Sequence, residues 1–423
     1  MSSGPPEDIK ASCERVARAA AEAAPAIRAL TGGERRSLLR DMASALRERT
    51  RLILDANAHD RVAAAGLSEA MRDRLSLDEE RIAAMARAIE HIADQPDPLG
   101  GVVEGRILPN GIRLERRRVP LGVVLVIYES RPNVTSDAAA LCLKSGNAVV
   151  LRGGREAAHS NRAIVDALRA PLNWRNMGGA LGFVDTPDRG AIDELLRMDK
   201  LIDLAIPRGG PALMSAVTAA ARVPVVKHDA GNCHVYVDQH LEGLEETAER
   251  IVINAKVQRP GVCNAAETLL VHRGVAERMI PRLTDALARS GVEVRGCERT
   301  RELAPRARPA TEEDWATEYL ALTIAVRVVD SLEEACAHIA RWGSRHTEAI
   351  LTASLLSAQR FTELIDSASV MINCSTRFAD GGEYGLGAEI GISTSKLHAR
   401  GPMGAADLTT TQWVLTGSGQ IRG

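Results

Sequence analysis

Cys263 is the residue of this chain whose surroundings most clearly favour chemistry. It lies in the run QRPGVCNAAET, residues 258–268, between a helical stretch at 245–256 and an apolar strand at 268–271. A thiol becomes a nucleophile when nearby positive charge or exposed backbone N–H groups lower its pKa. A packing cysteine lies more often in an apolar periodic run, as Cys336 does in the run ACAHI. The loop alone leaves a nucleophile and an incidental structural thiol as open alternatives.

The composition limits the classes of protein to which this chain can belong. The chain has 423 residues, of which 45% are apolar and 26% charged, and this is enough for two or three globular domains. A formal net charge of −2 argues against a nucleic-acid scaffold. The seven cysteines include no CxxC pair and stand near no grouped histidines, so we expect reduced thiols, with no disulfide framework and no metal site.

Two features of the chain predict a cytoplasmic protein that does not enter membranes. The first eight residues contain no basic segment followed by an apolar core, so no secretory signal is expected. The longest strongly apolar stretch, residues 119–128, is too short to span a bilayer.

The order of predicted elements indicates an α/β protein that is built around parallel sheets. Residues 9–94 read as successive helices, and the PNG turn at 109–111 joins two apolar-alternating arms in a hairpin. Short apolar strands then alternate with Ala-rich helices from residue 119, and a second α/β stretch follows residue 238. The tail from residue 373 ends in an alternating strand at 410–415.

Two glycine turns are candidate nucleotide contacts. The strings RGG at 152–154 and RGG at 208–210 each follow a predicted strand and open a helix, which is where an open α/β sheet binds nucleotides. Neither is a GxGxxG fingerprint, and glycine turns after strands are often purely structural. Nucleotide binding and a structural turn therefore both stay open on these residues alone.

Six motifs in one order resemble a known family. They are YESRPNV (128–134), LKSGNAVVLRGG (143–154), IPRGG (206–210), RPGVCN (259–264), HTEAI (346–350) and STRFADGGEYGLGAEIG (375–391). They resemble the γ-glutamyl phosphate reductase family, a branch of the aldehyde dehydrogenase superfamily, and the resemblance covers almost the whole chain. The departures from its pattern are Arg345, where a glycine is expected before His346, and Cys374, which would place a second thiol near the site.

The resemblance implies an aldehyde-dehydrogenase-like α/β fold with a discontinuous cofactor domain. Residues 1–238 would form the NADP-binding domain, with an oligomerisation hairpin at 102–119. Residues 239–370 would form the catalytic domain, and 371–423 would return to the cofactor domain and end in an oligomerisation strand. We expect a homo-oligomer, a dimer or a tetramer.

The implied reaction is the NADPH-dependent reduction of L-glutamyl 5-phosphate to L-glutamate 5-semialdehyde and phosphate, a step of L-proline biosynthesis. The Cys263 thiolate would attack the acyl carbon, expel phosphate and form a thioacyl enzyme, which hydride then reduces. A kinase that makes the acyl phosphate, glutamate 5-kinase, could channel it to this protein. The rival hypotheses are a CoA-acylating aldehyde dehydrogenase and a catalytically silent nucleotide-binding protein.

The resemblance also implies roles for two catalytic features. Asn133 matches a side-chain amide that stabilises an oxyanion together with the backbone N–H of Cys263. The alternative is that Asn133 only caps a helix that begins near Val134. The glutamate base of oxidising relatives is missing from residues 227–233, KHDAGNC, which suits an enzyme that reduces its thioacyl intermediate and must not hydrolyse it.

Ligand contacts are assigned by the same resemblance. An arginine after the second strand suits the 2′-phosphate of NADP(H). The expected cofactor contacts are Lys144, Arg152, Gly153, Arg208, Gly209, Gly210 and Glu318. The substrate carries charges of both signs, and its expected contacts are Arg131, Glu129, Ser375, Thr376 and Arg377. Each of these could instead hold loops together, and Cys233 is expected to be structural.

Overall fold

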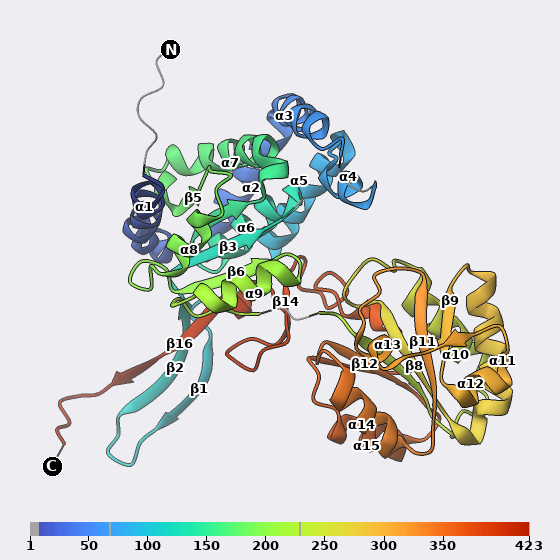
Figure 1. Ribbon diagram of the computed structural model, residues 1–423. Coiled ribbons are helices and arrows are strands. Elements are labelled where there is room, and N and C mark those ends of the chain that lie inside the picture. The colour runs from blue at the N-terminus through green and yellow to red at the C-terminus, as the bar shows by residue number, and fades with distance from the viewer. Residues whose placement is uncertain (1–7, 67–68, 130, 228–229, 423) are drawn as a thin grey trace.

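The computed structural model describes residues 8–66, 69–129, 131–227 and 230–422. It consists of two α/β lobes, with a long β-arm that extends from the first of them (Figure 1). The expectation about a secretory signal rests largely on residues 1–7, outside the described residues. Within the described ranges, no helix is both long and apolar enough to span a bilayer.

The first lobe is built on a parallel sheet whose strands run in the order β5-β4-β3-β6. The strands are β3 (Val123–Tyr128), β4 (Ala148–Gly153), β5 (Leu181–Phe183) and β6 (Leu204–Arg208). Every residue of β3 is buried, as expected for a central parallel strand that is covered on both faces. The parallel arrangement predicted from alternating strands and helices is confirmed.

Helices cover both faces of this sheet, and a helical N-terminal segment precedes it, as predicted. They are α1 (Ile9–Ala29), α2 (Gly32–Glu48), α3 (Thr50–Ala63), α4 (Glu69–Leu75), α5 (Glu79–Asp94), α6 (Pro132–Lys144), α7 (Ala158–Asn173), α8 (Gly190–Leu196) and α9 (Pro211–Ala220). After α9, Val225 makes only an isolated parallel bridge with Ala205 of β6.

The second lobe contains a parallel sheet in the order β10-β9-β11-β8-β7-β12-β13. Its strands are β7 (Cys233–Val237), β8 (Ala266–His272), β9 (Glu293–Gly296), β10 (Arg308–Pro309), β11 (Thr323–Val329), β12 (Thr347–Leu351) and β13 (Ser369–Ile372). Its helices are α10 (Glu245–Val257), α11 (Arg273–Arg289), α12 (Glu298–Leu303), α13 (Glu312–Ala316), α14 (Leu332–Trp342) and α15 (Leu355–Leu364). Alternate residues of one strand enter different cores: Leu269 packs on one face and Leu270 on the other.

The boundary expected at residue 238 is wrong. Strand β7 pairs with β8 and β12, so it belongs to the second sheet, and the chain crosses between lobes before Cys233. The return is also later than expected, because Ala379 still packs in the second lobe's core and Ile390 packs in the first. The apolar run of β7 alone did not reveal which sheet it joins.

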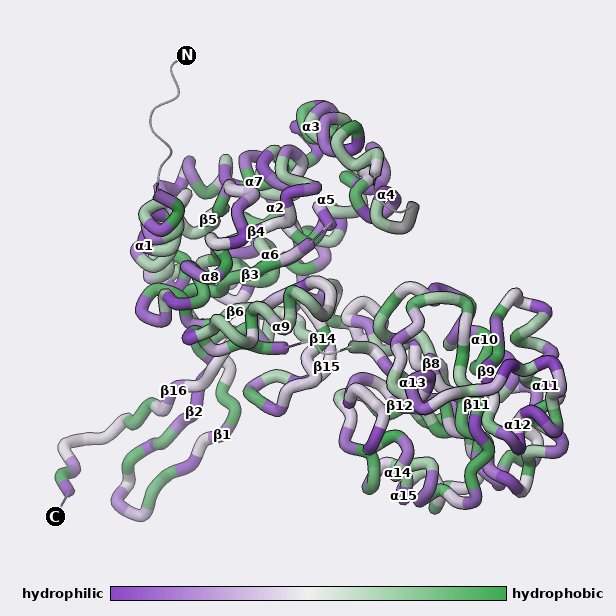
Figure 2. The backbone as a smooth tube through the Cα atoms, in the orientation of Figure 1, coloured by the Kyte–Doolittle hydropathy of each residue, from purple (hydrophilic) through white to green (hydrophobic). Residues whose placement is uncertain are grey.

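The arm consists of three antiparallel strands, β1 (Val102–Ile107), β2 (Arg113–Pro120) and β16 (Thr409–Thr416). The predicted hairpin and C-terminal strand are thus one sheet. Figure 2 shows hydrophobic and hydrophilic segments alternating along this arm, outside either lobe. Its exposed apolar side chains include Val103, Ile107, Trp413 and Leu415. The short segments of the tail are η3 (Thr376–Phe378), β14 (Ile392–Ser393), β15 (Gly401–Pro402) and η4 (Ala405–Leu408).

The two departures from the family pattern have different consequences in the structure. Arg345 has a φ of 61°, a left-handed conformation that glycine adopts without strain, so the turn is kept although the glycine is missing. The Cys374 thiol contacts the sulfur of Met371 and packs against the second lobe's core.

A buried ion pair closes the base of the loop that carries Cys263. Lys256, at the end of α10, and Glu267, at the start of β8, are both 0% exposed, and their charged atoms are 2.5 Å apart. A second oxygen of Glu267 accepts the backbone N–H of Leu320. Burial raises the pKa of Glu267 to about 7 even beside the lysine. Because both side chains are fully buried, removal of either member would leave the other charge without its counter-ion.

Removing one member of this pair should destabilise the second lobe strongly. We expect Lys256→Met to lower the free energy of unfolding by about 3–5 kcal/mol, because it leaves the Glu267 carboxylate buried without its cation. The double variant Lys256→Met/Glu267→Met should recover most of that loss. Urea unfolding of both variants is the measurement.

The half-buried pair Arg282–Glu249 joins α11 to α10 and is the matched control. Arg282→Met should change the stability by less than about 1 kcal/mol. If Lys256→Met were as mild as this control, the buried pair would not hold the loop.

Candidate active site

The loop that carries Cys263 is attached to the turn at 375–379. The Asn264 side-chain amide donates to the carbonyl of Ala379 over 2.9 Å, and the Thr376 hydroxyl donates to the carbonyl of Asn264 over 2.7 Å. Ser375 caps η3 by accepting the N–H of Arg377. Ser375 and Thr376, expected as substrate donors, therefore use their hydroxyls to position the loop.

On its other side the loop lies against Gly231. A β-carbon added at Gly231 would stand 1.9 Å from the carbonyl oxygen of Cys263, so only glycine fits. The Gly231 N–H donates to Glu318, which places this carboxylate near the thiol as well. The Cys233 thiol is buried and donates to the Cys263 carbonyl over 3.2 Å, in keeping with the structural role expected for it.

Burial and the nearby charges have opposing effects on the pKa of the Cys263 thiol. Burial raises its pKa to about 11, and the positive charges of Arg208 and Arg131 act to lower it. Glu389 and Glu318 act to raise it. In the ligand-free protein the thiol is therefore mostly protonated at neutral pH.

Arginine side chains gather around this thiol. Arg131 follows β3 and is the N-cap of α6; burial first, then Arg208, Arg74 and Arg259, lower its pKa to about 10. Arg377, expected as a substrate contact, donates to the side chain of Gln258 on the nucleophile loop. The pKa of Arg377 is lowered by burial, and the charge of Arg259 contributes. The structure thus brings Arg131 and Arg377 near Cys263.

Two charged neighbours were missed from the sequence. Arg74 lies on α4 of the first lobe and donates to the carbonyl of Gly261 over 3.1 Å. It stands in an Arg-rich helical region where nothing distinguishes it from the solvated arginines beside it. Glu389 lies 3.9 Å from Arg208 and accepts the N–H of Gly381. It belongs to the GLGAEIG string, which offered no role for it.

Asn133 lies in the first turn of α6, just past the carboxyl end of β3. Its amide is exposed and donates to Asp137 over 3.2 Å. The helix begins at Pro132 and its N-cap is Arg131, so the capping alternative is wrong. Burial raises the pKa of Asp137 to about 6, against the hydrogen bonds from Asn133 and Ser136 that lower it.

A separate cavity of 270 Å³ opens at the carboxyl ends of β3 and β4. Three guanidinium groups line it, those of Arg152, Arg155 and Arg189, and Glu129 is on the same wall. Arg152 donates to the carbonyls of Gly153 and Asp188. Its Nε is buried without a described partner, so this cation has capacity left for an anionic group. These residues fit the phosphorylated ribose of NADP(H).

Glycines shape the rim of that cavity. A β-carbon at Gly153 would stand 2.2 Å from Asn161, and one at Gly209 would stand 2.5 Å from Glu129. At Gly210 an added β-carbon would meet open space, and its N–H donates to Glu129. Of the three, Gly153 and Gly209 are closely approached by neighbouring side chains, which would have to shift to admit a β-carbon.

Three assignments differ from what was expected. Lys144 is buried at the far end of α6, where its ammonium donates to the carbonyls of Ala93 and Gln95, so it is not a cofactor contact. The carboxyl end of α6 lies on the side of the sheet where the strands begin, whereas nucleotides bind where parallel strands end. Arg208, expected at the cofactor, acts on the Cys263 thiol. Glu129, expected at the substrate ammonium, lines the cavity of 270 Å³ instead.

Other features of the site bear on its chemistry. His228 and Asp229, in the stretch that replaces the general base, lie outside the described residues. Within the described ranges, no group of three or more His, Cys, Asp or Glu is placed to hold a metal ion.

Comparisons with known proteins agree with this geometry. The model of the aldehyde dehydrogenase family matches residues 5–314. The chain is 52% identical over 418 residues to the γ-glutamyl phosphate reductase of Thermobifida fusca, covering 98% of this chain and 100% of that one. It is 53% identical over 406 residues to the enzyme of the same name from Moorella thermoacetica, covering 95% and 97%.

Solved structures show the same relationship. The γ-glutamyl phosphate reductase of Thermotoga maritima superposes with a TM-score of 0.95 at 44% identity, covering 97% of this chain and 100% of that one. An acetylating aldehyde dehydrogenase from Geobacillus thermoglucosidasius shares the fold, with a TM-score of 0.70 at 19% identity, covering 99% and 100%. The expected aldehyde-dehydrogenase-like fold is confirmed. The chain belongs to the aldehyde dehydrogenase family and, within it, to the γ-glutamyl phosphate reductases.

Proposed function

We propose that Cys263 is the nucleophile through which this enzyme reduces L-glutamyl 5-phosphate to L-glutamate 5-semialdehyde, in L-proline biosynthesis. The relatives at 52–53% identity carry the name of that activity. The observation that supports the mechanism is the thiol itself, half-buried in a loop held on both sides and facing Arg131 and Arg208. An acyl phosphate is a substrate that suits such a thiol, because phosphate is a good leaving group.

Attack by Cys263 forms a carbon–sulfur bond and breaks the bond from the acyl carbon to the phosphate oxygen. The thiol gives up one proton and the departing phosphate can accept one, so a thioester and hydrogen phosphate balance the step. This balance suits a thiol whose pKa is about 11, since no separate base is required. The glutamate that would activate water is absent from residues 227–233, which protects the thioester from hydrolysis.

The negative charge that develops on the acyl oxygen needs donors. We assign this role to the Asn133 amide and to the backbone N–H of Cys263, at the carboxyl end of β3 and in the nucleophile loop. A preorganised donor of this kind is typically worth roughly 3–4 kcal/mol of barrier. Asp137 orients the amide by accepting one of its hydrogens.

The cofactor that we propose is NADP(H), held by Arg152, Arg155 and Arg189 in the cavity beside β4. When bound, it supplies the hydride that reduces the acyl group. Gly153 allows close approach at the strand end, and Glu318, near Cys263, stands where a nicotinamide ribose contact is proposed.

We also propose a cytoplasmic location and an oligomer, a dimer or a tetramer, built through the β-arm. The exposed Val103, Ile107, Trp413 and Leu415 give the arm a surface that a second copy would cover. Handover of the substrate from glutamate 5-kinase is proposed on chemical grounds, because an acyl phosphate hydrolyses readily in water.

The reverse reaction tests the function. Purified protein is mixed with glutamate semialdehyde, NADP⁺ and phosphate, and the absorbance of NADPH is followed. The expected result is steady formation of NADPH that depends on phosphate. Formation that ignores phosphate, or that requires coenzyme A in its place, would assign the protein to another class of aldehyde dehydrogenase.

Replacement of individual cysteines identifies the nucleophile. Cys263→Ala should lower turnover by at least about 10⁴-fold while NADPH binding stays near normal, because the cofactor cavity is separate. Cys142→Ala, Cys233→Ala and Cys374→Ala should keep most activity. Steady-state assays measure turnover, and fluorescence titration with NADPH measures cofactor binding. Loss of activity in Cys374→Ala together with retention in Cys263→Ala would transfer the role to Cys374.

The raised pKa of Cys263 predicts how its reactivity changes with pH. Only the thiolate reacts with iodoacetamide, so the alkylation rate of the ligand-free enzyme should rise about tenfold per pH unit from pH 7 to 10. Peptide mass spectrometry at Cys263 follows the rate at each pH. A rate that levels off near pH 7 would show that the arginines outweigh burial, contrary to the pKa of about 11.

Introducing charged residues on the β-arm tests whether the arm forms the interface between copies of the chain. Val103→Glu combined with Trp413→Glu should reduce the molecular mass in solution to that of a monomer, because each carboxylate would be buried in the interface. Multi-angle light scattering measures the mass. Val62→Glu, at a still more exposed apolar position on α3, is the control and should leave the mass unchanged. A wild type that is already monomeric would rule out the arm as an interface.

A further inference from the structure

Arg74 reaches the nucleophile loop from the other lobe. It lies on α4 and donates from Nη2 to the carbonyl of Gly261, two residues before Cys263, over 3.1 Å. Neither the nucleophile, the cofactor cavity nor the turn at 375–379 needs this contact. An arginine side chain carries five N–H donors, and the bond to Gly261 occupies one of them.

Contacts of its two neighbours in the chain, Asp73 and Leu75, fix the position of Arg74 on α4. Leu75 is fully buried against Ala64 and Ala157, and its carbonyl accepts the Asn57 side-chain amide. Arg81 donates to the carbonyls of Asp73 and Ser76 and pairs with the Asp73 carboxylate at 2.7 Å. These contacts hold the end of α4, from which Arg74 reaches the Gly261 carbonyl of the second lobe.

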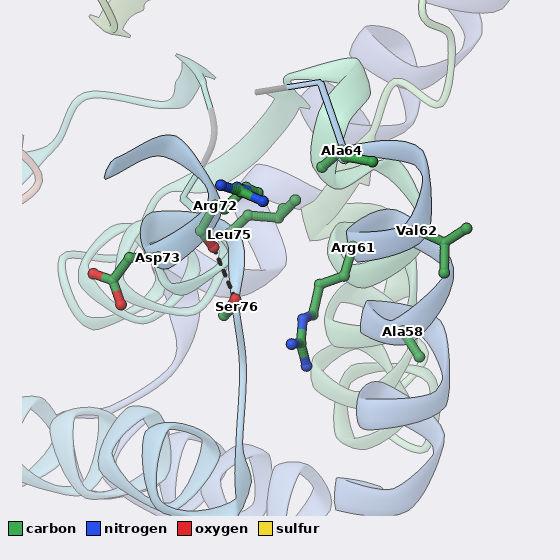
Figure 3. A pocket seen from close by; sticks show the side chains of 9 residues that line it. Ala58, Arg61, Val62, Ala64, Arg72, Asp73, Leu75 and Ser76 are labelled. Carbon is green, nitrogen blue, oxygen red and sulfur yellow. Dashed lines mark hydrogen bonds between the residues drawn. The ribbon is translucent and has the colours of Figure 1, made fainter. Parts of the chain in front are cut away.

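The opposite side of α4 faces a different space. Figure 3 shows Arg72, Leu75 and Ser76 at a cavity of 690 Å³ between α3 and α4, where the Ser76 hydroxyl donates to the carbonyl of Arg72. Arg72 and Arg74 thus lie on one short helix, yet only Arg74 has a described contact with the nucleophile loop. The pair offers a matched comparison within α4.

Arg74 joins a cluster of cations that centres on Arg131. The charges of Arg74, Arg208 and Arg259 all act on the Arg131 guanidinium, which in turn acts on Cys263. Two acids stand among these cations and offset only part of their charge: Asp73 pairs with Arg81, and Glu389 lies 3.9 Å from Arg208. Arginines gathered without equal negative charge repel one another, and a bound anion relieves that repulsion.

The chemistry decides which anion this cluster receives. The phosphoryl group is attached to the carbon that Cys263 attacks, whereas the α-carboxylate lies at the far end of the substrate. Arg131, whose charge acts on the thiol, and Arg74 and Arg259, whose charges act on Arg131, are therefore placed for the phosphoryl group. Guanidinium groups bind phosphate oxygens through charge-assisted, often paired, hydrogen bonds.

We propose that Arg74, together with Arg131 and Arg259, binds the phosphoryl group of the substrate, so that the phosphate subsite is completed by a residue of the first lobe. This inference rests on the proposed function and adds a substrate contact to it. The nucleophile loop and its leaving-group site are then assembled from both lobes, and Arg74 is a binding residue of the reaction.

The experiment measures inorganic phosphate as a substrate of the reverse reaction. Arg74→Ala should raise the KM for phosphate about 10- to 100-fold, the range expected on loss of a hydrogen bond to a charged group. The KM for glutamate semialdehyde should change less than about twofold, since that molecule has no phosphate. Arg74→Lys keeps the charge without the paired donors, so its KM for phosphate should lie between those of the wild type and Arg74→Ala. Arg72→Ala should behave as wild type.

A second measurement separates binding from bracing of the loop. Inorganic phosphate should slow the alkylation of Cys263 by iodoacetamide in the wild type and in Arg72→Ala, and this protection should need higher phosphate concentrations in Arg74→Ala. If Arg74→Ala lowers kcat with the KM for phosphate and the protection unchanged, Arg74 only braces Gly261 and the inference is overturned. If the wild type itself shows no dependence on phosphate, the proposed function fails instead. If Arg74→Ala does not fold, Arg74→Lys decides by the same two measurements.

Discussion

The backbone of Cys263 lies so close to that of Gly231 that no β-carbon can stand between them. The rest of the site depends on this contact, because it presses the nucleophile loop against the stretch by which the chain crosses between the lobes. Asn264 and Thr376 hold the same loop from the other side, and the Lys256–Glu267 pair closes its base. The thiol is thus positioned by backbone contacts and buried polar bonds, and its own side chain remains available for chemistry.

Placing a thiol this deep has an electrostatic consequence. Burial disfavours the thiolate more than Arg131 and Arg208 favour it, so the resting nucleophile holds its proton. The substrate accommodates this, since hydrogen phosphate leaves with one proton more than the phosphoryl group had. The charges of Arg208 on β6 and Arg131 at the start of α6 act on the thiol, and the charge of Arg74 on α4 acts on Arg131. This positive surrounding favours a substrate with a phosphorylated acyl group.

The sequence predicted most of the fold and singled out Cys263 as the candidate nucleophile, but it could not predict contacts that form only between distant segments. Apolar strands that alternate with helices indicated parallel sheets, and the polar turn at 258–264 distinguished Cys263 from the buried Cys142 and Cys336. The sheet that β7 joins was not predictable, because a buried strand has the same apolar pattern in either lobe. Lys144 was misassigned because its partners, two carbonyls at the end of α5, lie about 50 residues away in sequence. Arg74 had no signal at all, since exposed arginines are frequent on the N-terminal helices.

In the proposed mechanism, Cys263 holds the acyl group before phosphate takes part in the reverse reaction. This claim is tested most directly by rapid mixing of the enzyme with glutamate semialdehyde and NADP⁺ in the absence of phosphate. A burst of NADPH equal in amount to the active sites is expected, with a glutamyl group on the Cys263 peptide by mass spectrometry, and steady turnover should begin only when phosphate is added. If no NADPH forms until phosphate is present, or if the glutamyl group is found on another cysteine, the mechanism proposed for this site is contradicted.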